Sequence, residues 1–305
     1  MSGRASYADW VAVDWGTSRL RVWAMGADGS VRAEAASDDG MGGLARDGFA
    51  PALLDLIGPW LGAAPMPVLA CGMVGSRQGW AEMPYIAVPA KPGDLMPQHV
   101  KVGDARLRLF ILPGLSQTNP ADVMRGEETQ VAGFLAQEPG FDGVLCLPGT
   151  HTKWVQISAA EIVSFQTYMT GEMFALLAGQ SVLRHSIAPG GDAPDAFVAA
   201  VADSISRPER LAQRLFALRA ENVLHGLDGV AARARLSGHL IGAELSAARP
   251  YWLGQNVVVA GAAPLAGLYG QALAAQGVPV RVVDADGLTL AGLIRAAVHV
   301  LEPAS

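Results

Sequence analysis

One short pattern occurs twice in this chain. Residues 11–23 read VAVDWGTSRLRVW and residues 144–156 read VLCLPGTHTKWVQ, with glycine and threonine at corresponding places in both. Each copy has an apolar strand, a tight Gly-Thr turn and a second strand, which predicts a β-hairpin. Glycine lets a backbone approach an anion closely, and the threonine hydroxyl adds a donor. The repeat therefore predicts two related halves, each with a turn that can bind phosphate.

Length and composition narrow the class of protein. A chain of 305 residues, 51% of them hydrophobic, exceeds what one core usually serves, so we expect two domains. A formal net charge of −6 without a basic cluster argues against nucleic acid as the partner. The chain has no run of 18 apolar residues and no apolar leader, and its only cysteines are Cys71 and Cys146. These features predict a cytoplasmic protein that neither crosses a membrane nor relies on disulfides.

Hydrophobic periodicity predicts the same order of elements in both halves, a three-strand meander followed by alternating helices and strands. In the first half we expect strands near 10–13, 20–25, 31–35, 68–71 and 107–112, with helices over 49–61 and 126–135. In the second half we expect strands near 144–147, 154–158, 162–168, 256–260 and 280–283, with helical sequence up to 248, after 264 and over 288–301. The turn-rich stretch 139–143 separates a domain of residues 1–138 from one of residues 139–305. This α/β plan predicts two mixed sheets that face each other across a cleft.

Five strings, in order along the chain, resemble those of the 2-dehydro-3-deoxygalactonokinases: DWGTSRLRVW, CGMVGSRQGW, VMRGEETQ, LPGTHTKWV and MTGEMF. The resemblance runs from about residue 11 to the C-terminal helix. It implies the actin/hexokinase/Hsp70 fold, with two ribonuclease-H-like domains. It also implies transfer of the γ-phosphate of ATP to the 6-hydroxyl of 2-dehydro-3-deoxy-D-galactonate.

The first turn is preceded by a carboxylate. Asp14 lies where a carboxylate can hold Mg²⁺ through water while the turn binds phosphate oxygens. Taken alone, Asp14 can equally cap a β-turn, but the second Gly-Thr turn favours the metal role. The second copy has Leu147 and Pro148 at the places of Asp14 and Trp15, so a further carboxylate must come from elsewhere.

The further carboxylate is expected in the sequence MRGEETQ. Glu127 and Glu128 follow a glycine at the start of a predicted helix, and one of them can accept the proton of the attacking hydroxyl. The segment also resembles the Gly-x-Glu-Glu-Ala stretch of exopolyphosphatases, where a glutamate activates water. The alternative is that both glutamates only complement the helix dipole. We predict Glu127, Glu128 and Asp14 as the catalytic residues and leave open which glutamate is the base.

The nucleotide is expected on the two turns and on a platform of small residues. Gly261 and Ala262 follow the apolar strand VVVA, and the backbone there can support adenosine ahead of the helix that Pro264 begins. The resembling kinases often have a hydroxyl or charged residue just after this glycine, and Ala262 departs from that pattern. Residues 169–173, MTGEM, are expected to line the same cleft, unless Glu172 only caps its helix. The predicted nucleotide-binding residues are Gly16, Thr17, Ser18, Gly149, Thr150, His151, Lys153, Gly261 and Ala262.

A sugar acid needs cationic and hydroxyl donors. Arg77 and Arg125 lie in glycine-containing motifs, and either can bind a carboxylate in bidentate fashion, although lone arginines are usually solvated surface residues. Trp80 can stack on the sugar or be a core aromatic. The predicted substrate-binding residues are Ser76, Arg77, Gln78, Trp80 and Arg125.

The function expected from these residues is that of an ATP- and Mg²⁺-dependent sugar-acid kinase. One alternative is a polyphosphate or nucleotide phosphatase of the same fold, and another is a non-catalytic sugar-acid sensor. The donors of CGMVGSRQGW argue against the first, and two intact turns argue against the second. A homodimer is left open, because the helical surface with Phe197, Val198 and Val201 can be core or interface.

Overall fold

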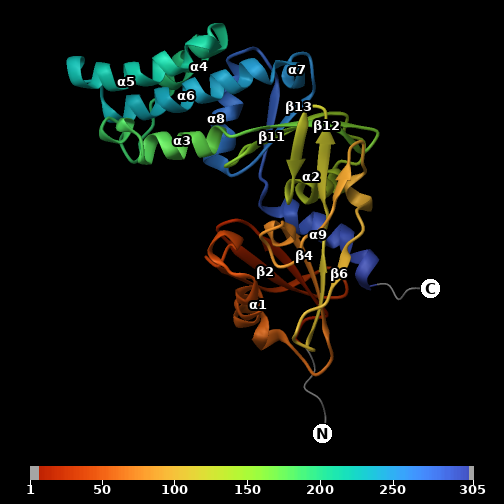
Figure 1. Cartoon of the computed structure of the whole chain (residues 1–305). Helices are drawn as coiled ribbons and strands as arrows, with labels where there is room; N and C mark the ends of the chain where they lie inside the picture. Colours follow the sequence, from red (N-terminus) through yellow and green to blue (C-terminus); the bar gives the residue numbers. More distant parts are fainter. Residues whose placement is uncertain (1–6, 302–305) are drawn as a thin grey trace. The chain divides into compact units, whose positions relative to one another are not determined.

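The computed structural model describes residues 7–301, which group by their contacts into two units (Figure 1). Unit 1 contains the described residues up to Phe141, together with Ser158–Val163 and the stretch from Ala285. Unit 2 contains Asp142–Ile157 and Ser164–Asp284. No helix among the described residues is long and apolar enough to cross a membrane.

Unit 1 is built on a six-stranded mixed sheet. Its order is β3 (Val31–Ser37), β2 (Leu20–Met25), β1 (Trp10–Trp15), β4 (Met66–Gly72), β7 (Leu107–Ile111) and β6 (Gln98–Val100). β1 pairs antiparallel with β2 and parallel with β4, so it lies inside the sheet and is buried over almost its whole length. This arrangement confirms the first predicted hairpin.

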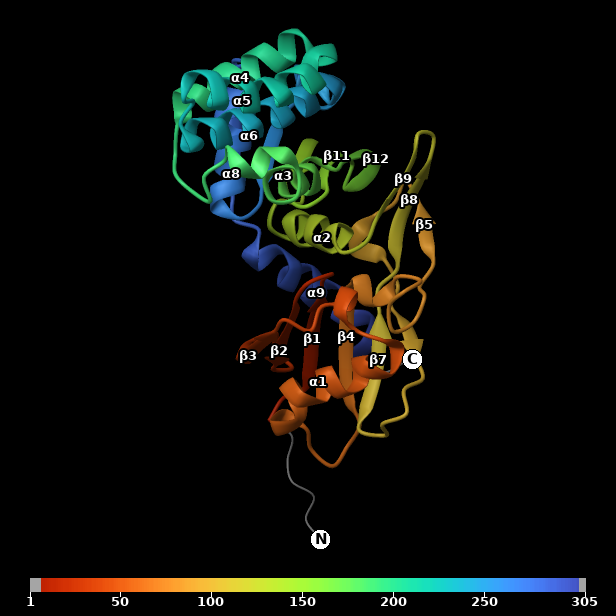
Figure 2. The same cartoon turned by 60° about the vertical axis from the view of Figure 1, so that its left-hand side comes forward.

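Three helices and a small sheet complete unit 1: α1 (Phe49–Ile57), α2 (Glu127–Gln137), α9 (Asp286–Leu301) and the sheet of β5 (Tyr85–Ala87), β8 (Gly114–Thr118) and β9 (Ala121–Met124). Short 3-10 helices lie at Met41–Gly43, Arg46–Gly48, Gly58–Trp60, Met73–Gly75 and Pro92–Asp94. A side chain at Gly133 would overlap Leu288 of α9, so glycine allows the backbones of α2 and α9 to approach closely. Figure 2 shows the small sheet beside α2.

Unit 2 repeats the sheet order. It runs β12 (Glu161–Tyr168), β11 (Thr152–Ser158), β10 (Gly143–Leu147), β13 (Val257–Ala260) and β14 (Val280–Val283). β10 pairs antiparallel with β11 and parallel with β13, as β1 does with β2 and β4. The repeat detected in the sequence is therefore a repeat of the sheet.

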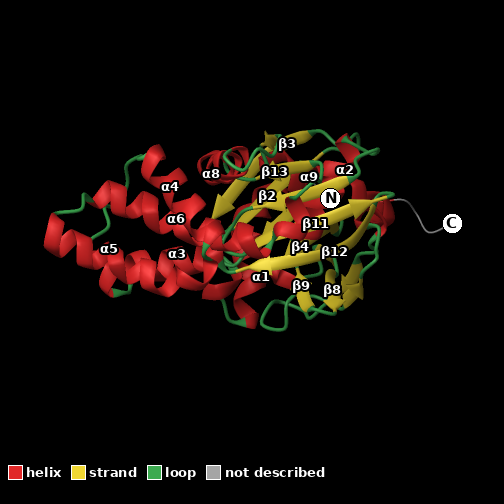
Figure 3. Cartoon of the chain, turned by 90° about the horizontal axis from the view of Figure 1, so that it is seen from above, coloured by secondary structure: helices red, strands yellow, loops and turns green. Residues whose placement is uncertain are grey.

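The helices of unit 2 form a layer in which α6 contacts α3, α4 and α5 (Figure 3). The helices are α3 (Thr170–Gly179), α4 (Pro194–Ser206), α5 (Leu211–His225), α6 (Gly229–Ala247), α7 (Arg249–Trp252) and α8 (Ala263–Ala274), with short 3-10 helices at Val182–His185 and Pro208–Arg210. Phe197 and Val201 of α4 are buried, and Val198 packs partly buried against the same cluster. These residues belong to the core of unit 2, which was one of the two alternatives for them.

The predicted strands are all present, most with bounds shifted by one to three residues. The sequence did not predict β5, β6, β8 and β9, which are three to five residues long and therefore too short for a clear period. The sequence divided the chain into residues 1–138 and 139–305, whereas α9 packs along α2 and groups with unit 1.

Candidate active site

The first Gly-Thr turn is held by backbone hydrogen bonds from a distant segment. The N–H of Gly16 donates to Arg19 O (2.9 Å), while the N–H groups of Met41 and Gly42 donate to Gly16 O (3.0 Å) and Thr17 O (2.8 Å). Thr17 and Ser18 are exposed. The carbonyls of the turn are thus occupied, and its hydroxyls are available to a ligand. The segment that holds the turn was not predicted.

Asp14 is paired with an arginine that the sequence analysis did not single out. Arg21 lies opposite Asp14 across the β1–β2 hairpin and donates to its Oδ2 from Nη2 (2.6 Å) and Nε (3.2 Å). The Oδ1 atom faces Cys71 Sγ of β4 at 3.9 Å, and the side chain is 21% exposed. The pairing has a sequence signal, because the two residues are placed symmetrically about the turn.

A single carboxylate suits Mg²⁺ that is held mainly by water and phosphate. Among residues 7–301 no group of three or more His, Cys, Asp or Glu side chains could enclose a metal ion. Asp14 keeps one oxygen that no arginine occupies, so its donor chemistry fits such an ion.

The two glutamates at the start of α2 have different environments. Glu128 is 1% exposed and accepts the N–H of Gly126 on both oxygens (2.9 and 2.7 Å) and the Thr129 hydroxyl (3.2 Å). Glu127 is partly exposed and accepts the N–H of Arg125 (3.1 Å). Both carboxylates thus fold back on the backbone before the helix, but only Glu127 is open to a ligand.

Buried ionisable side chains link the start of α2 to Asp14. Burial raises the pKa of Glu128 to about 7, and the charge of Glu127 raises it further. Burial raises the pKa of the Cys71 thiol as well, and the charges of Asp14 and Glu128 add to the effect. A side chain at Gly72, the next residue after Cys71, would meet Trp15 O at 2.7 Å. Asp14, Cys71 and Glu128 therefore form one cluster within unit 1.

We expect stability to fall with rising pH because of Glu128. Between about pH 4.5 and pH 7 the folded state keeps the proton on Glu128 and the unfolded state releases it, so the free energy of unfolding decreases. The full effect is about 3 kcal/mol. Urea titrations at several pH values should show that Glu128→Gln gains stability relative to wild type across this window, while Glu127→Gln keeps a smaller fall with pH, because burial still raises the pKa of Glu128 but the charge of Glu127 no longer adds to it. A difference that does not change with pH would contradict the buried, raised carboxyl.

The two candidate arginines are in opposite environments. The Arg77 side chain is 80% exposed and reaches Glu82 at 3.4 Å. Arg125 is 8% exposed, donates from Nη2 to Met83 O (2.9 Å) and lies 4.3 Å from the centre of the Tyr85 ring. Its Nε and Nη1 are buried and have no hydrogen-bond partner among the described residues.

The rest of the predicted sugar-acid segment divides in the same way. Ser76 is 5% exposed, and its hydroxyl also lacks a partner among the described residues. Gln78 is exposed. Trp80 packs against Phe49 and Trp15, with ring centres 6.0 Å from each, which favours the core role for this aromatic.

The second Gly-Thr turn meets the start of α3. The N–H of Glu172 donates to Thr150 O (2.9 Å), and the Glu172 carboxylate lies 2.6 Å from His151 Nε2. Any side chain at Gly171 would overlap Gly149 O. The helix N-terminus therefore lies directly against the turn, and both favour a bound anion. Lys153 is 4% exposed on β11, opposite Leu147 of β10.

A mainly apolar cavity of about 430 Å³ adjoins this turn. Its lining includes Gly149, Thr150, Phe174, Arg233, Leu265 and Leu268, so it extends from the turn to α3, α6 and α8. Pro264 lines it at the start of α8. A side chain at Gly261 would meet the Pro148 ring at 3.4 Å. The cavity wall does not include His151, Lys153, Gly261 or Ala262. The helical residues of this wall were missed, because their sequence looks like ordinary helix.

Two sheets that share the same order over five strands, each with a Gly-Thr turn after the third of them, define a protein of the actin-like ATPase and sugar-kinase fold. The sequence model of the 2-keto-3-deoxy-galactonokinase family matches residues 14–296, and the chain belongs to this family.

Individual relatives agree with this assignment. The probable 2-dehydro-3-deoxygalactonokinase of Rhizobium meliloti is 41% identical, over 94% of this chain and 96% of the relative. The 2-dehydro-3-deoxygalactonokinase of Escherichia coli is 37% identical, over 96% of this chain and 98% of the relative. A crystal structure of a candidate 2-dehydro-3-deoxygalactonokinase from Sinorhizobium meliloti has a TM-score of 0.87 at 39% identity, covering 96% of this chain and 99% of that one.

Proposed function

We propose that this protein transfers the γ-phosphate of ATP to the 6-hydroxyl of 2-dehydro-3-deoxy-D-galactonate, in the cytoplasm. The observation that carries the proposal is the cavity of unit 2, which adjoins a Gly-Thr turn in a chain of the 2-keto-3-deoxy-galactonokinase family. Its size and apolar lining suit a nucleoside, and the turn suits the phosphates attached to it.

We assign the binding of ATP to unit 2. Phe174, Leu265 and Leu268 provide apolar walls for adenosine, and Pro264 lines the cavity beside them. Gly261 and Ala262 lie outside the wall and are kept as a proposed backbone support. Gly149 and Thr150, together with the start of α3, bind phosphate oxygens. His151 and Lys153 follow the turn as further phosphate contacts. His151 is already engaged with Glu172, so a phosphate there would compete with that carboxylate.

We assign the binding of the sugar acid and the reacting groups to unit 1. Asp14 would hold Mg²⁺ through water, and the metal, when bound, neutralises charge on the phosphates. Thr17 and Ser18 donate to phosphate oxygens, and Gly16, whose N–H is held by Arg19 O, lets the backbone approach the phosphate closely. Glu127 accepts the proton of the 6-hydroxyl of the sugar acid. The hydroxyl oxygen then bonds to the γ-phosphorus while the bond from that phosphorus to ADP breaks. Glu128 keeps the start of α2 in place.

The carboxylate of the sugar acid binds Arg125, with Ser76 as a neighbouring donor. Buried guanidinium N–H groups without an acceptor are energetically expensive, and a buried polar group without a partner indicates a missing ligand. Tyr85 covers Arg125 but is itself 42% exposed, so the ring can turn aside and admit a carboxylate. Gln78 is left to contact the hydroxyl groups, because the packing of Trp80 on Phe49 and Trp15 favours a core role for that ring.

Arg125→Ala should raise the Michaelis constant for the sugar acid by about ten- to a hundredfold, because a charge-assisted hydrogen bond contributes about 1.5–3 kcal/mol. The Michaelis constant for ATP should change little. Arg77→Ala is the matched control, and its exposure predicts a change of a few-fold at most. Steady-state kinetics with each substrate varied will test both. A larger effect at Arg77 would transfer the carboxylate contact to that residue.

A coupled ADP-release assay with and without the sugar acid tests the function as a whole. ADP release that depends strictly on 2-dehydro-3-deoxy-D-galactonate supports the kinase. Release that is indifferent to the acid would indicate a phosphatase, and binding of the acid without ADP release would indicate a sensor. Epimers of the acid assayed in parallel define the stereochemistry at C4.

A further inference from the structure

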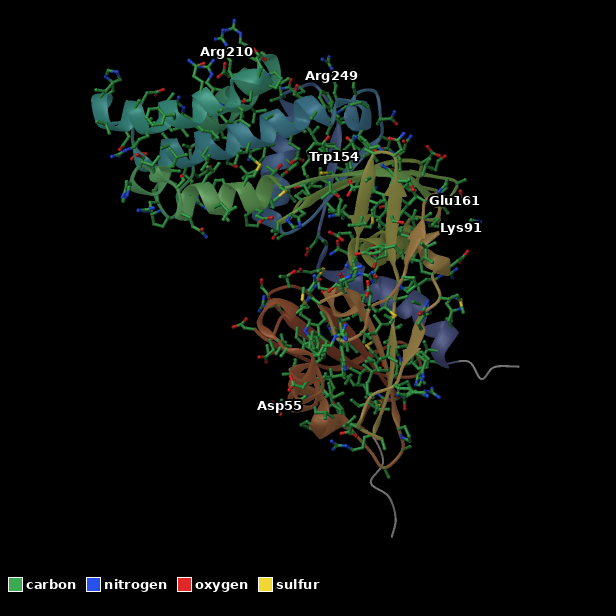
Figure 4. The ribbon with its side chains drawn as sticks, in the orientation of Figure 1. Asp55, Lys91, Trp154, Glu161, Arg210 and Arg249 are labelled. Atoms are coloured by element: carbon green, nitrogen blue, oxygen red, sulfur yellow. The ribbon has the colours of Figure 1, made fainter. Side chains whose placement is uncertain are left out.

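A buried carboxylate lies behind the cavity of unit 2 and has no part in the proposed reaction. Glu244 of α6 is 3% exposed and accepts hydrogen bonds from Trp154 Nε1 on Oε1 (2.8 Å) and from the Tyr269 hydroxyl on Oε2 (2.7 Å). The Thr170 side chain donates to it as well, and the Thr152 hydroxyl lies 2.8 Å from that of Tyr269. Figure 4 labels Trp154 on the sheet of this unit.

These partners come from different walls of the cavity. Thr170 begins α3 and Tyr269 lies on α8, and both line the cavity. Thr152 and Trp154 lie on β11, which follows the second Gly-Thr turn. One carboxylate therefore joins the phosphate turn, the helix start against it and the helix of the adenosine platform.

A glutamine at this position cannot make the same set of bonds. The indole of Trp154 only donates, and it engages a different oxygen from Tyr269. A carboxamide has one acceptor oxygen, so glutamine would keep the bond to Trp154 and present N–H to Tyr269. The tyrosine hydroxyl would then have to turn, and its bond with Thr152 would change too. Burial of the carboxylate is unfavourable in itself and raises the pKa of Glu244 to about 7.

We propose that Glu244 is a positioning residue for nucleotide binding, which holds the phosphate turn, α3 and α8 in the arrangement that ATP requires. The inference rests on the proposed function, because it takes the cavity of unit 2 as the nucleotide site. Glu244 acts through Thr152, Thr170 and Tyr269 and does not touch the nucleotide itself.

Calorimetric titration of the full-length protein with ADP tests the inference without turnover. Glu244→Gln and Tyr269→Phe should each raise the dissociation constant for ADP about tenfold or more, which is the scale of a lost hydrogen bond to a charged group. The double variant should be no weaker than the weaker single variant, because both changes break one network. The dissociation constant for the sugar acid should stay within a few-fold of wild type in all three.

Glu221→Gln is the matched control. Glu221 also accepts hydrogen bonds in the helical layer of unit 2, from Arg235, but it does not line the cavity. It should bind ADP as wild type does. If Glu244→Gln fails to fold by circular dichroism, Tyr269→Phe carries the test, because it removes a single hydroxyl.

The outcomes separate the inference from the function. Wild-type protein that binds no ADP would overturn the proposed nucleotide site. If the wild-type protein binds ADP and Tyr269→Phe binds it with the same affinity, the role of Glu244 is overturned. The same holds if the losses of ADP affinity in the two single variants add independently in the double variant. An equal loss of affinity for ADP and for the sugar acid would show a general effect on folding and would also overturn it.

Discussion

Glu127→Gln lowers the turnover number by about 10²–10⁴-fold and leaves ADP affinity nearly unchanged, which is the result expected when a general base is removed. Glutamine keeps the volume of the side chain and can still accept the N–H of Arg125. It cannot take a proton from the 6-hydroxyl. The measurement is the single-turnover rate at saturating ATP and sugar acid, which excludes product release.

Glu128→Gln is the control variant, and its turnover is compared with that of Glu127→Gln. The two glutamates are adjacent on a helix and point about 100° apart, so both cannot address one hydroxyl. Glu128 is closed off from ligands by its burial and by its bonds to Gly126 and Thr129, so its variant should lose far less turnover. A large loss only in Glu128→Gln would make the buried carboxyl the base. If turnover stays within a few-fold of wild type in both variants, neither glutamate is the base, and both only stabilise the start of the helix.

The repeat in the sequence predicted more of the fold than any other feature. Strand, turn and strand at residues 11–23 and 144–156 became the β1–β2 and β10–β11 hairpins, because a two-residue side-chain period and a tight turn are local properties. Local pattern says nothing about which distant helix covers a sheet. The placement of α9 against α2 depends on glycines at 133 and 292, whose meaning is visible only when the two backbones meet.

The candidate site was predictable by residue type but not by environment. Both arginines lie in glycine-containing motifs, and only the fold reveals that Arg125 is buried and Arg77 exposed. Burial is a tertiary property, so motif spacing could not separate them. Glu127 and Glu128 were predicted either to support the start of the helix or to act in catalysis, and both roles place them in the first turn of that helix. The hydrogen bonds to the backbone before the helix show the supporting role, and the catalytic role stays a prediction.

Asp14→Asn should lower turnover by about a hundredfold or more while the fold is retained. Asparagine keeps the shape of the side chain and can still accept a hydrogen bond from Arg21, but it lacks the charge that holds a metal's water shell. Arg21 is 32% exposed, so water can solvate the guanidinium that loses its charged partner. The loss should be partly recovered at high Mg²⁺ if the weakened step is metal binding.

Asp9→Asn is the matched control for this prediction. Asp9 also pairs with an arginine of the same sheet, Arg32 at 2.7 Å, and is 44% exposed. Its variant removes one carboxylate charge and one ion pair from unit 1 without changing the first Gly-Thr turn, so turnover should stay within a few-fold of wild type. Turnover is to be measured over a Mg²⁺ titration, with thermal unfolding of both variants alongside. If Asp14→Asn behaves as Asp9→Asn does, then Asp14 only pairs with Arg21 across the hairpin, and the metal must be held by other groups.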